Sequence, residues 1–233
     1  MINVRIGVIC SSNGGVIRAV TDIINQSCAD QHEMYVITDR DCGIEDFCRS
    51  KKVNFCRIAD SKNDSFSQSA KEYFDLHGVE FVLLFFTRLI HENLFCHIPV
   101  FNIHPSLLPA FTGFRPIERA VEMNVKFLGA TLHLINDKAD SGSIIAQNIV
   151  PIITDYDINI LHKISFLQKT YLSLLLIELM EHREIEFSGN YAKAVLKRVN
   201  NRVTASCNPA LNNEKYSVAF NRLQMQEGIG MIL

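Results

Sequence analysis

Residues 5–10 of the chain are Arg5-Ile6-Gly7-Val8-Ile9-Cys10, and Ser11-Ser12-Asn13-Gly14-Gly15 follow directly. The first stretch is a continuous apolar run of strand length, and a helical pattern of apolar residues begins at Val16. A buried strand that turns through glycines into a helix is typical of a parallel sheet covered by helices on both faces. The opening of the chain therefore predicts an α/β fold.

The same alternation continues through the first hundred residues. Short β-prone runs recur at Met34–Thr38, Val53–Ile58 and Val79–Phe86, and segments suited to helices lie between them at Ile44–Lys51 and Phe66–Leu76. Apolar strands that alternate with helices predict a doubly wound, mostly parallel sheet of the Rossmann-like type.

The pattern changes after residue 102. Pro105, Pro109 and Gly113 indicate a loop, and a short helix is predicted at Pro116–Glu122. Two apolar, β-prone runs follow a turn apart, at Gly129–Ile135 and Ser143–Val150, which predicts a β-hairpin or a long paired loop.

A long helical pattern then begins at a cap, Asp155 or Asp157, and runs to about His182. Patterning is weak beyond this helix. We therefore expect a catalytic domain over residues 1–189 and a C-terminal extension of uncertain order over 190–233.

Composition limits the class of protein. The chain has 233 residues, 48% hydrophobic and 21% charged, which is enough for one good core. A net charge of −2 gives no electrostatic case for binding nucleic acid or an acidic membrane, and no apolar run approaches the roughly 20 residues that span a bilayer. The N-terminus shows no secretory signal pattern.

The seven cysteines are odd in number and lack CxxC spacing, so we expect reduced thiols, no metal site and a cytoplasmic location.

The candidate chemistry lies in Phe101-Asn102-Ile103-His104-Pro105-Ser106-Leu107-Leu108-Pro109 and in Asp140-Ser141-Gly142. Asn102 and His104 fall at the end of an apolar strand, where ligands bind in open α/β sheets. An amide N–H can stabilise an oxyanion, an imidazole can move a proton, and a carboxylate can orient the imidazole. Taken alone, these residues are more simply explained by turn and capping roles.

The signature resembles that of the folate-dependent formyltransferases. The similarity covers Asn102–Pro109, Gly113, Gly129–His133 and Asp140–Gln147, and extends over roughly residues 3–185. It implies that Asn102, His104 and Asp140 are catalytic and that the formyl donor is N10-formyltetrahydrofolate. It also implies two sides of a pterin pocket, one made by Arg88, Leu89 and Ile90 and the other by Ile135, Asn136, Asp137 and Ala139. By the same resemblance His133 is a buried histidine that supports the site. Ser106 lacks the Gly-x-Ser-x-Gly setting of a nucleophile, so we expect it to cap the loop.

The resemblance points to more than one class of acceptor. The length is similar to that of the glycinamide ribonucleotide transformylases, in which a Gly-Ser-Asn run holds the substrate phosphate. Here Gly14, Gly15 and Val16 align with that run and lack the hydroxyl and the amide, and Gln168 aligns with a glutamate that binds the ribose. Residues 113–120 look more like the methionyl-tRNA and amino-sugar enzymes, but we expect no counterpart of the basic C-terminal domain of the tRNA enzyme.

We therefore predict a small amine acceptor, on an amino sugar, that contacts Ser11, Ser12, Asn13, Gly14, Gly15 and Arg115. The first three residues are equally compatible with a simple strand-to-helix turn. Three alternatives stay open at this point: a purine-pathway transformylase, a formyltetrahydrofolate deformylase, and a binding protein without turnover. No nucleic-acid or membrane partner is expected, and the sequence allows a homodimer.

Overall fold

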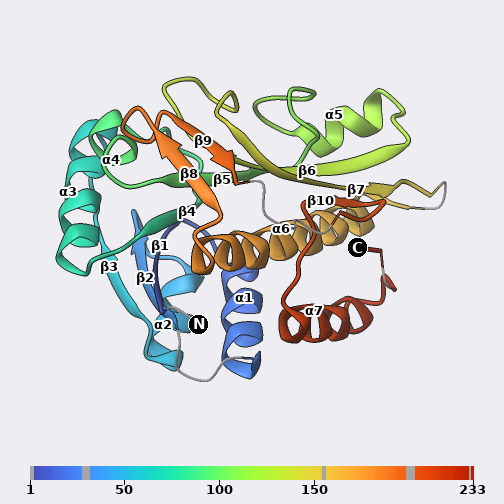
Figure 1. The fold of residues 1–233 in the computed structure, drawn as a ribbon, viewed down its shortest axis with the longest axis horizontal. Helices are drawn as coiled ribbons and strands as arrows, with labels where there is room; N and C mark the ends of the chain where they lie inside the picture. Colours follow the sequence, from blue (N-terminus) through green and yellow to red (C-terminus); the bar gives the residue numbers. More distant parts are fainter. Residues whose placement is uncertain (1–2, 28–31, 154–155, 198–202, 231) are drawn as a thin grey trace.

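The apolar run at the start of the chain forms β1 (Val4–Cys10), a central strand of an eight-stranded sheet (Figure 1). The computed structural model describes residues 3–27, 32–153, 156–197, 203–230 and 232–233. The strand order is β10-β7-β6-β5-β4-β1-β2-β3. Because β1 lies between β2 and β4, the chain runs outward from it in both directions, as in doubly wound folds.

One half of the sheet is parallel and the other is antiparallel. Strands β2 (His32–Thr38), β3 (Asn54–Arg57), β4 (Phe81–Phe85) and β5 (Val100–His104) run parallel to β1. Strands β6 (Phe127–Leu134), β7 (Ile144–Pro151) and β10 (Cys207–Asn208) add antiparallel pairs. The predicted fold class is confirmed, and the two apolar runs predicted to pair form β6 and β7.

Helices cover both faces of the sheet. Buried side chains of α1 (Gly15–Ser27), α2 (Gly43–Lys51), α6 (Ile158–Glu181) and α7 (Glu214–Gln226) share one apolar cluster with β1. Helices α3 (Asn63–Leu76) and α4 (Glu92–Phe95) belong to a second cluster. Helix α5 (Pro116–Glu122) covers the antiparallel end together with the start of α6. The burial of both faces explains why the interior parallel strands β1 and β4 are almost wholly apolar.

Helix α6 begins where the sequence predicted a cap. The Asp157 carboxylate accepts a hydrogen bond from Ile160 N at 2.8 Å, which satisfies a backbone donor of the first turn. The other predicted cap, Asp155, lies outside the described residues. Buried side chains are found along the whole length of the helix, so α6 is a core element of the fold.

The C-terminal part packs onto the rest of the molecule. Strands β8 (Ile185–Ser188) and β9 (Lys193–Leu196) form a separate antiparallel hairpin, and the boundary expected after residue 189 falls inside its turn. A buried ion pair, His32 Nε2 to Glu181 Oε1 at 2.7 Å, joins β2 to α6, and the Tyr216 hydroxyl of α7 lies 3.2 Å from the same nitrogen. The sequence left the structure of residues 190–233 open, and their described part forms β9, β10 and α7. The division into two domains stays a prediction.

Candidate functional site

A cavity of about 540 Å³ lies at the carboxyl ends of β1, β4 and β5. Its walls come from the segment after β1, from Leu84–Thr87 and from Asn102–Pro105, with Arg40 and Lys169 completing the lining. This is the edge where the connections from β1 diverge to the two sides of the sheet. Ligands of open α/β sheets bind at such an edge.

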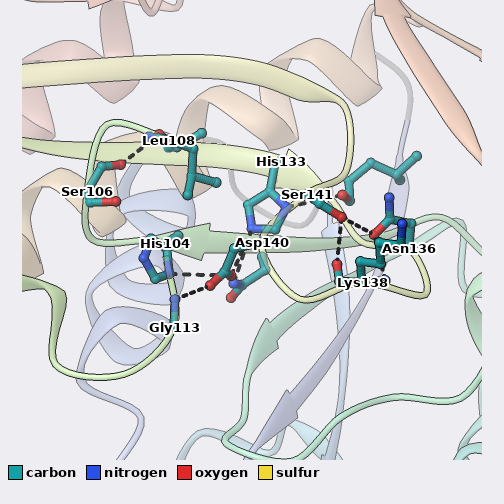
Figure 2. Close-up of polar contacts among 12 residues, drawn as sticks. His104, Ser106, Leu108, Gly113, His133, Asn136, Lys138, Asp140 and Ser141 are labelled. Carbon is teal, nitrogen blue, oxygen red and sulfur yellow. Dashed lines mark hydrogen bonds and ion pairs between the residues drawn. The ribbon is translucent and has the colours of Figure 1, made fainter. Parts of the chain in front are cut away.

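His104 is held at the end of β5 by both ring nitrogens. Its Nε2 lies 2.8 Å from the Phe111 carbonyl oxygen, and since a carbonyl only accepts, Nε2 donates this hydrogen bond. Its Nδ1 faces Asp140 Oδ1 at 3.4 Å (Figure 2). This distance exceeds the roughly 2.7–2.9 Å of a short charge-assisted bond, and His104 also lines the cavity.

Asp140 is fixed by the backbone around it. Its Oδ2 accepts a hydrogen bond from Gly113 N at 2.7 Å, which joins the loop after β6 to the loop after β5 (Figure 2). Its own backbone is left-handed, with φ of 53°, a conformation that Asp and Asn tolerate better than most residues. Two residues on, a Cβ at Gly142 would lie 1.7 Å from the Leu134 carbonyl oxygen. The loop therefore follows β6 so closely that only glycine fits there.

Asn102 is oriented by His133, which lies opposite it in the β5–β6 ladder. His133 Nδ1 lies 3.1 Å from the Leu134 carbonyl oxygen and so donates to it. Burial lowers the pKa of His133, which favours the neutral ring with a lone pair on Nε2. Asn102 Nδ2 donates to that nitrogen at 3.3 Å. The amide nitrogen has a second N–H, and Asn102 lines the cavity.

The rest of the signature holds the loop in place. Thr131 Oγ1 donates to the Ser106 carbonyl at 2.7 Å and accepts from Leu108 N at 3.0 Å and from Gln147 Nε2 at 2.9 Å. Ser106 Oγ donates to the Ala110 carbonyl at 2.5 Å. Ser106 thus has the loop-holding role predicted for it. Thr131 and Gln147, from the downstream part of the signature, hold the same loop.

The Arg88 segment follows β4 but does not line the cavity. The Arg88 guanidinium donates to the Asp60 carbonyl at 2.6 Å and lies over the Phe66 ring, which fixes the loop against the start of α3. Leu89 is 67% exposed, whereas Ile90 is buried. The role of this segment in holding a pterin stays a prediction.

The loop after β6 approaches the same region of the core. Ile135 packs against the apolar cluster that contains Ile90, so the two segments predicted to hold the pterin meet a common cluster. Asn136 Oδ1 accepts from Ser141 Oγ at 2.9 Å and closes the turn, while Asp137 and Ala139 are exposed. These contacts shape the loop and leave its outer residues free to meet a ligand.

The predicted acceptor residues separate into two groups. Ser11, Ser12, Gly14 and Gly15 line the cavity. Asn13 lies outside the lining, where a Cβ added to Gly43 would meet its side-chain oxygen at 2.5 Å, and Arg115 is an exposed residue at the start of α5. The buried Gln168 does not line the cavity either, because its amide donates to the Leu128 carbonyl at 3.1 Å.

Sequence reasoning missed Arg40 and Lys169. Arg40 follows β2, and Lys169 is a charged residue in the long, largely buried helix α6. A lysine between the apolar helical positions Leu167 and Tyr171 is a sequence signal that could have been noticed, although it does not show that this turn faces the cavity.

Three further observations bear on the class of protein. Within the described ranges, no group of three or more His, Cys, Asp or Glu side chains could hold a metal ion. No described helix is long and apolar enough to cross a bilayer. Six cysteines of the described chain are free thiols, and the seventh, Cys28, lies outside it. A cytoplasmic location stays a prediction.

Comparison with known proteins identifies the family. The family model described as "Formyl transferase" matches residues 4–173. The chain is 29% identical over 164 residues to the chloroplastic phosphoribosylglycinamide formyltransferase of Arabidopsis thaliana, a match that covers 65% of this chain and 56% of the relative. It is 40% identical over 78 residues to the formyltetrahydrofolate deformylase of Haemophilus influenzae, covering 33% and 28%. The chain thus spans less than two thirds of the length of either relative.

A solved structure agrees with this result. The glycinamide ribonucleotide transformylase 1 of Symbiobacterium toebii superposes with a TM-score of 0.74 at 27% identity, covering 83% of this chain and 93% of that one. The eight-stranded mixed sheet is therefore a fold that this transformylase shares. The chain belongs to the formyl transferase family.

Proposed function

We propose that the chain transfers a formyl group from N10-formyltetrahydrofolate to the primary amine of phosphoribosylglycinamide. The observation that carries the proposal is the convergence of Asn102, His104 and Asp140 beside one cavity. The family model and the relatives named for phosphoribosylglycinamide support the reaction and the acceptor. None of the relatives named above is an amino-sugar enzyme, so the acceptor first predicted from sequence gives way to its alternative.

The three groups suit a direct transfer. The unprotonated amine attacks the formyl carbon and forms the new C–N bond, and the carbonyl oxygen becomes an oxyanion. Asn102 Nδ2 and His104 Nδ1 would donate to that oxygen, and one such fixed donor is typically worth about 3 kcal/mol of barrier. Asp140 Oδ1 lies 3.4 Å from Nδ1, where the carboxylate can orient the ring.

Collapse of the intermediate breaks the bond between the carbon and N10 of the folate. The amine nitrogen gives up one proton and N10 gains one, so the proton count balances and tetrahydrofolate leaves. Catalysis comes from positioning and from fixed donors, and no covalent bond to the protein is needed. Ser106 is not a nucleophile in this scheme, because its hydroxyl already donates to the Ala110 carbonyl.

The test is a panel of acceptors supplied to the purified chain with N10-formyltetrahydrofolate. We expect formylation of phosphoribosylglycinamide and a much slower reaction with nucleotide-linked amino sugars. Preferential formylation of an amino sugar would contradict the acceptor and leave the chemistry intact. Absence of tetrahydrofolate with every amine would contradict both.

Hydrolysis is the second candidate, because deformylases are among the named relatives. A deformylase would pass the formyl group to water at the same site, and the products would be formate and tetrahydrofolate. Release of formate at the same rate with and without an amine would favour this reaction. We prefer transfer because the transformylase structure matches 93% of its own length.

A further inference from the structure

Residues 111–113, a short segment in the loop before α5, hold both members of the His104–Asp140 pair. Phe111 supplies the carbonyl oxygen that accepts a hydrogen bond from His104 Nε2 at 2.8 Å. Gly113 supplies the N–H that donates to Asp140 Oδ2 at 2.7 Å. The positions of the imidazole and the carboxylate relative to each other therefore depend on the conformation of this segment.

The backbone of the segment is left-handed at both ends. Phe111 has a φ of 54° and Gly113 has a φ of 81°. Glycine adopts this region freely, but the region is unfavourable for an aromatic residue and persists only where the surroundings hold it. Residues 111–113 therefore depend on contacts from outside the segment to keep their shape.

Arg119 of α5 makes such contacts. Its Nη1 donates to the Thr112 carbonyl at 2.6 Å, and its guanidinium lies over the Phe111 ring, with Cζ 5.8 Å from the ring centroid. Long side chains on a helix lean towards its N-terminus, which directs Arg119 back to the residues that precede α5. One side chain thus holds the start and the middle of the segment.

Helix α5 gives Arg119 a fixed base. Ile117 of this helix is buried in an apolar cluster that also contains Leu128 of β6 and Leu161 of α6. Ala120, the residue after Arg119, is buried as well. The guanidinium therefore ties the segment to a helix that is itself packed against the sheet and α6.

Arg119 does not take part in the cavity itself. Neither Arg119 nor residues 111–113 line the cavity beside Asn102 and His104. The arginine is an exposed residue, so it is not needed to fill the core. Its contacts reach His104 and Asp140 only through the segment, which is the arrangement expected of a positioning residue.

We infer that Arg119 is a positioning residue that keeps His104 and Asp140 in place through residues 111–113. The inference rests on the proposed function, because it takes this pair to act in formyl transfer. It also gives a role to one residue of the stretch 113–120, which the proposed acceptor leaves unexplained. Loss of the guanidinium should loosen the pair and leave both substrates bound as before.

Two variants of Arg119 isolate its contacts. Arg119→Met keeps most of the length and removes the charge and every donor. Arg119→Lys keeps a donor for the Thr112 carbonyl and loses the planar group. Arg222→Met is the matched control, because Arg222 is an exposed arginine of α7. The melting temperature of each variant is measured first, so that a lower kcat is not confused with loss of the fold.

Steady-state kinetics with phosphoribosylglycinamide and N10-formyltetrahydrofolate test the role. We expect Arg119→Met to lower kcat about 10-fold, the lower end of the range for a hydrogen bond that involves a charged group, because this contact is exposed. Both KM values should change by less than about two-fold, since no interaction with either substrate is removed. Arg119→Lys should stay within about three-fold of the wild-type kcat, because it keeps a donor. An unchanged kcat in Arg119→Met, or an equal loss in Arg222→Met, would overturn the inference.

Amide hydrogen exchange at Gly113, followed by NMR, separates this inference from the proposed function. The Gly113 N–H donates to Asp140, so its exchange rate reports how often the segment opens, with no turnover required. We expect exchange at least about five-fold faster in Arg119→Met than in wild type, and unchanged in Arg222→Met. If this pattern holds and no amine is formylated, the positioning role stands and the proposed function fails. If exchange and kcat are both unchanged in Arg119→Met while formylation proceeds, the positioning role is refuted and the proposed function stands.

Discussion

Replacing Asp140 with Asn isolates the charge that faces His104. Asn fits the left-handed backbone at this position, and its side-chain oxygen can still accept from Gly113 N. The variant therefore keeps the loop and removes one negative charge 3.4 Å from His104 Nδ1. A substitution by Ala would add backbone strain and confuse the two effects.

The expected loss follows from that distance. Two unit charges 3.4 Å apart interact by about 5 kcal/mol at an effective dielectric constant near 20, and by about 1 kcal/mol in water. The Asp140 side chain is 11% exposed, so its environment lies between these limits. Since about 1.4 kcal/mol corresponds to a factor of ten, we expect kcat to fall about 100- to 1,000-fold.

The assay measures kcat and KM for both substrates, together with the melting temperature. The KM for the folate should change little, and the melting temperature should stay within about 2 °C of the wild type. Asp46→Asn on α2, where the side chain is 84% exposed, controls for the loss of any one carboxylate. A fall in kcat of less than five-fold in a well-folded Asp140→Asn variant would refute the electrostatic role.

Three further predictions concern the surroundings of the site. His133→Phe removes the hydrogen-bond acceptor of the Asn102 amide, so we expect kcat to fall about 10- to 100-fold with unchanged folate affinity. An unaltered kcat would show that the amide keeps its orientation without His133. Gly142→Ala places a Cβ 1.7 Å from a carbonyl oxygen, so thermal unfolding should show a large loss of stability, and a melting temperature equal to that of wild type would contradict the close approach. Because burial lowers the pKa of Lys169, the unfolded chain binds more protons there, and the stability of the wild type relative to Lys169→Met should rise between neutral pH and about pH 10 in urea unfolding. A difference that is flat or falls with pH would contradict this burial effect.

The fold was largely predictable because its signals are local. Continuous apolar runs marked β1, β2 and β4, and Pro116 marked the first residue of α5. Helix α4 was not predicted, because four residues are too few to show a periodic pattern of apolar residues. The hairpin β8–β9 and helix α7 lie where the periodicity of apolar residues is weak, so they were not predicted. Their positions depend on contacts with elements distant in sequence.

The site was predictable only in part. The motif and its resemblance indicated Asn102, His104 and Asp140, but a motif does not state which atoms face each other. The contact between Asn102 and His133 depends on the register of β5 against β6, which a single sequence does not reveal. Lys169 was hidden for a related reason, since helical periodicity places it on α6 without showing that this turn faces the cavity.

The position of the formyl group is the central quantity. A crystal structure of the chain with phosphoribosylglycinamide and a non-transferable analogue of N10-formyltetrahydrofolate would measure it directly. We predict that the formyl oxygen lies within about 3.2 Å of both Asn102 Nδ2 and a His104 ring nitrogen, with Asp140 still beside that ring. An analogue bound with its formyl group elsewhere, and with these three side chains turned away from it, would contradict the account.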